Sequence, residues 1–261
     1  MLLKNKNAII YGAGGAIGGA VARAFAREGA KVFCTGRTLS KLQAVATDIR
    51  KEGGWAEAVK LDALDKNSVE TYLECIAKKE GGIDISFNAI GLDDIQGQPL
   101  TQMTHAQFAL PIVNAIPSHF YTATAAARHM ARKGAGVILA ITANVAVKPM
   151  PHSGGFGVAC AAIESFCRQL AVEVGKQGVR VICLRSAGSP DAPGVDEAFN
   201  QHAENAGVSR EEFEQEMAKV TMLKRLPKLH EIANVAVLMA SDRANIITGA
   251  IANVTCGEIA D

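Results

Sequence analysis

The amino-acid sequence predicts an α/β fold in which a doubly wound parallel sheet carries helices on both faces. Short apolar runs alternate along the 261-residue chain with longer segments of helical pattern, which is the order of βα units. The apolar runs alternate little with polar residues, and this indicates strands buried on both faces, as in a parallel sheet. No linker interrupts the pattern, so we expect a single domain over residues 1–261.

The strands are expected at the short β-rich runs, of which the first reads Asn-Ala-Ile-Ile-Tyr. They cover residues 7–11, 31–35, 56–61, 83–88, 137–142, 179–184 and 250–254. The helices are expected between them, beginning with a segment rich in small residues and including one that ends at Gly81 and Gly82. They cover residues 16–27, 39–51, 67–79, 156–175 and 232–240, with a central helix that contains Asn114 and residues 120–127.

One edge of the predicted sheet is the expected ligand site, because right-handed crossovers bring the carboxyl ends of all parallel strands together there. A Pro/Gly-rich stretch over residues 186–194 leads into a polar, charged segment that reaches residue 219. We expect one or two inserted helices near residues 186–220 that cover the substrate at this edge. The alternative is a surface loop without that role.

Composition and charge exclude several classes of protein. Hydrophobic residues make up 49% and charged residues 20%, which argues against disorder. The formal net charge of +1 predicts no bulk attraction to nucleic acid or membrane. The six cysteines form no Cys-x-x-Cys pair and lie in apolar runs, so free thiols in a reducing compartment are expected. With no cationic leader before the first strand and no metal-ligand spacing of histidines, we expect a cytoplasmic protein without a metal.

A glycine-rich turn joins the first strand to the first helix. The string Tyr-Gly-Ala-Gly-Gly-Ala-Ile-Gly covers residues 11–18. Glycines let the backbone approach a pyrophosphate closely, and the helix N-terminus supplies N–H donors and a positive dipole. This predicts a dinucleotide site that includes Gly12, Gly14, Gly15, Ile17 and Gly18. The alternative is a structural turn that holds no ligand.

This turn resembles the Thr-Gly-x-x-x-Gly-x-Gly signature of the short-chain dehydrogenase/reductase family, with Tyr11 and Ala16 as departures. The resemblance continues to the C-terminus. It includes residues 88–91 (Asn-Ala-Ile-Gly), Asn114 on the central helix, residues 178–181 and residues 247–249. It implies a Rossmann-like fold, oxidoreductase activity and a nicotinamide dinucleotide, with Asn88 and Gly91 beside the cofactor.

The end of the second strand predicts which dinucleotide binds. The chain reads Cys-Thr-Gly-Arg-Thr over residues 34–38, without the carboxylate that would hold an unmodified ribose. The Arg37 guanidinium, next to Thr38, offers donors suited to a 2′-phosphate, so we favour NADP(H) over NAD(H). The alternative is an arginine exposed on a surface turn. Asp62 matches a family position that binds the adenine amine, although an N-cap role competes for it.

The family's proton-transfer set is missing. Counting back from residues 178–181, the Tyr position falls on Phe156, the Lys position on Cys160 and the Ser position on Ala143. Of the four family positions, only Asn114 is kept. Phe has no proton to give, Cys carries no cation at neutral pH, and Ala cannot hydrogen-bond.

Several polar residues are candidates for replacing the missing groups. The first choice is His152, because imidazole titrates near neutrality. The other candidates are Thr142, Asn144, Ser153, Tyr121, Asp93 and Asp94, with Cys160 as a less favoured nucleophile. We therefore assign Asn114 and His152 as the candidate catalytic residues.

Three functions remain open from sequence. The first is an NADP(H)-dependent oxidoreductase with a non-standard catalytic set. The second is a catalytically inactive nucleotide-binding sensor or partner subunit. The third is a non-redox isomerase or lyase that uses the family's substrate pocket. The small and apolar residues of the central and 156–175 helices further predict a homo-oligomer, a dimer or tetramer, acting on an unidentified small molecule.

Overall fold

The computed structural model describes residues 1–260 and confirms the doubly wound parallel sheet. All seven strands are parallel and lie in the order β3-β2-β1-β4-β5-β6-β7. The strands are β1 (Asn7–Tyr11), β2 (Lys31–Gly36), β3 (Trp55–Lys60), β4 (Ile85–Asn88), β5 (Gly136–Ala143), β6 (Val179–Ser186) and β7 (Ile251–Val254). The order reverses between β1 and β4, so the ligand crevice of such a sheet opens at their carboxyl ends.

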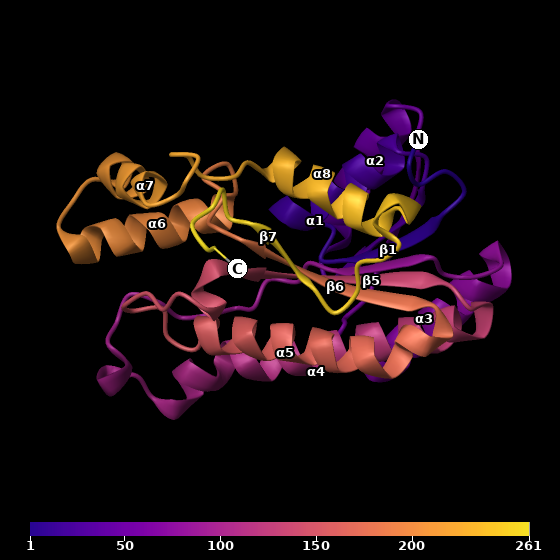
Figure 1. Ribbon diagram of the computed structural model, residues 1–261, viewed down its shortest axis with the longest axis horizontal. Helices are drawn as coiled ribbons and strands as arrows, with labels where there is room; N and C mark the ends of the chain where they lie inside the picture. Colours follow the sequence, from indigo (N-terminus) through magenta and orange to yellow (C-terminus); the bar gives the residue numbers. More distant parts are fainter. Residues whose placement is uncertain (261) are drawn as a thin grey trace.

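Eight α-helices lie within the described residues. They are α1 (Ala16–Arg27), α2 (Leu39–Lys51), α3 (Lys66–Glu80), α4 (His105–Lys133), α5 (Phe156–Val174), α6 (Pro193–Ala206), α7 (Arg210–Lys219) and α8 (Leu229–Ala240). Figure 1 shows α1, α2 and α8 on one face of the sheet and α3, α4 and α5 on the other. Each face carries its own core, with Phe25 buried in the first and Leu73 in the second. No helix among residues 1–260 is both long and apolar enough to span a lipid bilayer.

The predicted 186–220 insertion forms α6 and α7, which lie together at one end of the sheet near the C-terminus (Figure 1). A small cluster of Phe199 on α6 with Ala187 and Leu226 holds the pair of helices to the domain. The rings of Phe199 and Phe213 meet edge to face at 5.4 Å between centroids. The insertion therefore packs beside the carboxyl end of β6.

Candidate active site

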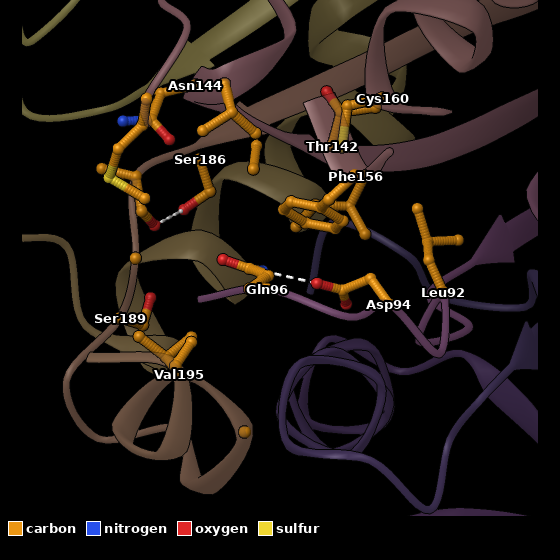
Figure 2. Close-up of a pocket in the computed structure, with 18 of the residues that line it drawn as sticks. Leu92, Asp94, Gln96, Thr142, Asn144, Phe156, Cys160, Ser186, Ser189 and Val195 are labelled. Atoms are coloured by element: carbon orange, nitrogen blue, oxygen red, sulfur yellow. Dashed lines mark hydrogen bonds between the residues drawn. The ribbon is translucent and has the colours of Figure 1, made fainter. Parts of the chain in front are cut away.

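A cavity of about 390 Å³ lies at the carboxyl edge of the sheet (Figure 2). Its walls come from the turns that follow β4, β5 and β6, from the first residues of α5 and from α6. Ile17 of the glycine-rich turn also lines it, which joins the cavity to the predicted dinucleotide site. Most of the lining is apolar, with a few polar groups, as in many sites for small organic molecules.

A second cavity of about 190 Å³ adjoins the first. The two share residues 89–91 as a common wall, just beyond β4. Five predicted cofactor residues line the second cavity, namely Gly12, Gly15, Arg37, Asp62 and Gly91. The two hollows thus offer space for an extended, two-part ligand, with the second cavity beside the end of β2.

The glycine-rich turn depends on two close backbone contacts. Gly12 has φ of +77°, and a Cβ atom there would lie 2.6 Å from the carbonyl oxygen of Ala89. A Cβ atom on Gly18 would lie 2.3 Å from the carbonyl oxygen of Gly12. Because both contacts involve backbone atoms, neither can relax by moving a side chain. These glycines therefore hold α1 close to β1 and leave its N-terminal N–H groups open toward the cavities.

Replacing Gly18 with alanine is expected to lower the free energy of unfolding by about 1–3 kcal/mol, because the added methyl group forces the turn apart. It should also weaken dinucleotide binding, since the N–H donors of α1 shift with the turn. Urea denaturation and titration calorimetry measure the two effects. Gly175→Ala is the matched control, because its methyl group meets open space. Equal stability of the two variants would contradict the proposed role of the turn.

The remaining predicted cofactor residues support the site from outside the cavity walls. Gly14, Gly18, Thr38 and Asn88 line neither cavity. Asn88 is buried, donating from Nδ2 to Thr122 Oγ1 at 3.1 Å and accepting at Oδ1 from the N–H of Ile90 at 3.1 Å. It thereby fixes the 89–91 turn.

Asp62 accepts from the N–H of Leu64, and Asp65 is the N-cap of α3, so the N-cap alternative for Asp62 is wrong.

Arg37 lies at the end of β2, with its side chain 63% exposed. Its only side-chain partner among residues 1–260 is Asp93, whose Oδ2 lies 3.4 Å from Nη2 and whose side chain is 54% exposed. An exposed pair at this distance is weak and is easily exchanged for another anion. The guanidinium is therefore available at the mouth of the smaller cavity.

The two predicted catalytic residues do not share a cavity. Asn114 lines the smaller cavity, together with Ser118 from the next turn of α4. His152 has φ of +63°, and its carbonyl oxygen accepts from the N–H of Gly97, but it is not among the residues that line the larger cavity. Of the alternative candidates, Thr142, Asn144 and Asp94 line the larger cavity and Asp93 the smaller. Tyr121 and Ser153 line neither.

Ala143, Phe156 and Cys160 do come together, on the floor of the larger cavity. Figure 2 shows the Phe156 ring and Cys160 reaching the cavity from neighbouring turns of α5. Burial raises the pKa of the Cys160 thiol to about 12, so the sulfur stays protonated and makes a poor nucleophile at neutral pH. The floor of the cavity therefore offers no cation and no ready acid.

The nearest hydroxyl groups are already engaged. Thr142 donates to Oε1 of Glu164 at 3.0 Å, and Ser186 donates to the carbonyl oxygen of Ala187 at 2.7 Å. Ser189 is the exception, since its buried hydroxyl has no hydrogen-bond partner among the described residues. A buried polar atom beside a cavity points to a polar group of a ligand.

A buried ion pair lies behind the cavity floor, and sequence reasoning missed it. Glu164 on α5 and Arg185 on β6 are each 2% exposed. Arg185 donates from Nε and Nη2 to the two carboxylate oxygens, both at 2.8 Å. Glu164 is one helical turn beyond Cys160, so the pair fixes this part of α5 against β6. The sequence signal was a charged residue inside each of two largely apolar segments.

A second ion pair that the sequence did not predict, Lys148 with Glu258, closes the cavity from the C-terminal side. The Glu258 side chain is 1% exposed and accepts from Lys148 Nζ at 2.9 Å and from Asn144 Nδ2 at 2.7 Å. All three residues line the cavity. The C-terminal segment is thus tied to the loop between β5 and α5.

The α6 helix is tied to the loop that follows β4. His202 of α6 donates from Nε2 to Oε1 of Gln96 at 2.7 Å, because the Gln96 amide itself donates to Asp94. Asn205 donates to the carbonyl oxygen of Gly97 at 3.1 Å. Burial lowers the pKa of His202 and His152 lowers it further, while the Asp94 carboxylate opposes the shift; the net direction is downward, so the ring is neutral at neutral pH. These bonds hold α6 over the cavity.

Comparison with known proteins agrees with this geometry. Residues 12–258 match the family model described as enoyl-(acyl carrier protein) reductase. An uncharacterized oxidoreductase of Bacillus subtilis, YxbG, is 30% identical over 247 residues, which cover 95% of this chain and 88% of that protein. The 7alpha-hydroxysteroid dehydrogenase of Clostridium sardiniense is 28% identical over 256 residues, covering 98% and 94% of the two chains.

The fold is also that of known dehydrogenases. The crystal structure of NAD+-bound xylitol dehydrogenase superimposes with a TM-score of 0.92 at 20% identity, covering 98% of this chain and 100% of that one. The family model spans nearly the whole chain, from the glycine-rich turn to the Glu258 segment. The chain therefore belongs to the short-chain dehydrogenase/reductase family of oxidoreductases.

Proposed function

We propose that the protein is an NADP(H)-dependent oxidoreductase whose reaction runs without the Ser, Tyr and Lys of its family. The carrying observation is the larger cavity, which reaches from the glycine-rich turn to a floor made of Ala143, Phe156 and Cys160. The family implies a nicotinamide dinucleotide, and the largely apolar cavity suits a small organic substrate beside it. Nothing on the floor can transfer a proton at neutral pH.

The residues present fit such a cofactor. The close backbone approach at Gly12 and the open N-terminus of α1 suit a pyrophosphate. The unpartnered Ser189 hydroxyl can donate to the nicotinamide carboxamide, and Asp62 can accept from the adenine amine. When bound, the dinucleotide supplies or accepts the hydride. The protein orients the substrate against it and excludes water through α6.

Selection of NADP(H) is assigned to Arg37. Its exposed guanidinium lies at the mouth of the smaller cavity with a weak partner, and can exchange that partner for a 2′-phosphate. Thr38 follows at the N-cap of α2, where its side chain makes no capping bond. Its hydroxyl is therefore open to the same phosphate.

Replacing Arg37 with aspartate is expected to weaken NADPH binding at least 100-fold and NADH binding less than threefold. The substitution removes a bidentate charge-assisted contact to NADPH only, and it adds a carboxylate that repels the 2′-phosphate. Loss of one charged contact costs about 3 kcal/mol, which corresponds to the 100-fold weaker binding of NADPH. Titration calorimetry with both dinucleotides measures the ratio, and Arg27→Asp, on the far end of α1, is the control for net charge. Equal losses for both dinucleotides would remove the assignment.

A second candidate function rests on the inert cavity floor. With Cys160 protonated and Phe156 in place of an acid, a nucleotide-binding sensor or an inactive partner subunit fits the same residues. Tight NADPH binding without turnover, and co-purification with a Tyr- and Lys-bearing relative, would favour it. A non-redox isomerase or lyase is distinguished by activity that persists after the cofactor is removed.

The assembly and location follow as proposals. Apolar side chains are exposed on the outer face of α4 and α5, with Phe120 at 48% and Val158 at 49%. Such a face suits pairing with a second copy of the chain into a dimer or tetramer. A monomeric mass by light scattering would overturn this. A cytoplasmic location, with no nucleic-acid or membrane partner, stays a prediction.

The decisive test of the proposed function is stereospecific transfer. The protein is incubated with 4-deuterated NADPH and a panel of activated acceptors, and the product is analysed by mass spectrometry and NMR. Deuterium at one face of one product carbon supports the proposal. Failure to bind NADPH contradicts it directly.

A further inference from the structure

The larger cavity carries a negative charge that no cation balances. Among its described lining residues, three are charged at neutral pH: Asp94, Lys148 and Glu258. The Lys148 ammonium and the buried Glu258 carboxylate form an ion pair at 2.9 Å, so their charges cancel. His202, the remaining titratable group with a nitrogen, is neutral because burial lowers its pKa. The negative charge of Asp94 is therefore not balanced by a cation among the described lining residues.

Asp94 has no cation of its own. Its carboxylate accepts from the Gln96 amide, and it forms no ion pair within residues 1–260. Asp94 and Cys160 line the same cavity. Burial is the main cause of the raised pKa of Cys160, and after Cys183 and Glu164 the Asp94 carboxylate makes a smaller contribution. Figure 2 shows Asp94 and Gln96 on the same cavity as the Phe156 ring. A carboxylate and an aromatic face in one largely apolar cavity are the groups that bind organic cations.

The floor of the cavity also lacks a group that could neutralise an alkoxide. Hydride addition to a ketone creates a negative oxygen that must take a proton or a positive charge. Phe156 and Ala143 offer neither, and the Thr142 hydroxyl is committed to Glu164. The unpaired Asp94 carboxylate opposes any further negative charge nearby. Neutral carbonyl substrates are thus poorly matched to this site.

We propose that the substrate is an organic cation with an iminium C=N⁺ bond, or the tertiary amine that results from its reduction. The inference rests on the proposed NADP(H)-dependent function. Hydride and its electron pair form the new C–H bond at the iminium carbon, and the C=N π pair becomes the lone pair of the amine nitrogen. NADPH becomes NADP⁺, so one positive charge stands on each side and no proton is transferred.

This reaction needs only what the residues supply. Asp94 attracts the cation, the Phe156 ring can lie against it, and α6 excludes water. The substrate loses its positive charge as the nicotinamide gains one, so the cavity keeps a single cation throughout. The absence of a proton donor on the floor then costs nothing in rate.

The test uses N-methyl-3,4-dihydroisoquinolinium as substrate and 1-tetralone as a neutral ketone of the same bicyclic shape. NADPH binding is first measured by calorimetry. We expect saturable reduction of the iminium ion, with kcat/KM at least 100-fold above that for the ketone. Asp94→Asn should lower the iminium kcat/KM about tenfold through KM. Glu197→Gln, which removes an exposed charge from α6 outside the cavity, should leave it unchanged.

A binding readout separates recognition from turnover. N,N-dimethyl-1,2,3,4-tetrahydroisoquinolinium is a permanent cation that cannot be reduced, and calorimetry measures its Kd on the wild type, Asp94→Asn and Glu197→Gln. We expect a tenfold weaker Kd for Asp94→Asn alone.

The outcomes distinguish the two proposals. If NADPH does not bind, the proposed function fails and the inference with it. If NADPH binds and kcat/KM for 1-tetralone equals that for the iminium ion, the inference is overturned while nucleotide binding stands. The same holds if NADPH binds and neither compound is reduced. Unchanged cation binding in Asp94→Asn also overturns it.

Discussion

Replacing Glu164 with alanine is expected to lower the free energy of unfolding by about 3–5 kcal/mol. The substitution removes the carboxylate that accepts two bonds from the buried Arg185 guanidinium, both at 2.8 Å. Most of the cost is the desolvation of a charge that has lost its main counter-ion, rather than the loss of the pair itself. Thr142 loses the closer of its two oxygen acceptors as well, so the cavity floor should loosen. Urea denaturation followed by circular dichroism measures the change.

Two further variants separate this cause from loss of volume. Arg168 lies 3.6 Å from the same carboxylate but is 51% exposed, so Arg168→Ala should change stability by less than about 0.5 kcal/mol. The double variant E164M/R185M leaves no buried guanidinium and should be more stable than Glu164→Ala. A Glu164→Ala protein as stable as Arg168→Ala would show that the buried pair contributes little.

Local patterns predicted the fold because they are set by residues close in sequence. The apolar runs fixed the order of strands and helices, and the observed boundaries differ by a few residues only. The predicted strand 83–88 begins at Ile85, and Asp84 before it accepts from the N–H of Asn7 through its side chain and pairs with Lys133. The predicted helix 232–240 begins earlier, at Leu229, where the Glu231 carboxylate accepts from the N–H of Lys228 at 2.9 Å.

The predicted cofactor residues could be placed in the fold from the sequence for the same reason. The glycine-rich turn and Arg37 each directly follow a strand, so their place at the sheet edge comes from the strand alone. The polar network around the larger cavity could not be predicted from the sequence. Arg185 and Glu164 are 21 residues apart, and Asn144 and Glu258 are 114 apart. Such pairs depend on how the helices and the C-terminal segment pack, and a single sequence does not contain that information.

Restoring the family set is expected to create ketone reduction. The variant A143S/F156Y/C160K should reduce 1-tetralone with kcat/KM about 10²- to 10⁴-fold above the wild type, which is the usual contribution of a positioned proton donor. The three side chains line one cavity, so a hydroxyl, a phenol and an ammonium at these positions can act together. Position 160 is 1% exposed, but the cavity gives a longer side chain room to extend. Steady-state kinetics with NADPH measures the gain.

The ammonium is the critical addition, and A143S/F156Y/C160M tests it with a side chain of similar length and no charge. Without a nearby cation the phenol keeps its high pKa and transfers protons poorly, so this variant should gain little. The same ammonium neutralises the unbalanced Asp94 carboxylate, and should raise the KM for N-methyl-3,4-dihydroisoquinolinium about tenfold. Ketone and iminium activities should therefore move in opposite directions. If the lysine variant folds and binds NADPH but both activities stay at the wild-type level, Phe156 and Cys160 do not occupy the positions of the family's acid and cation, and the alignment that equates them is wrong.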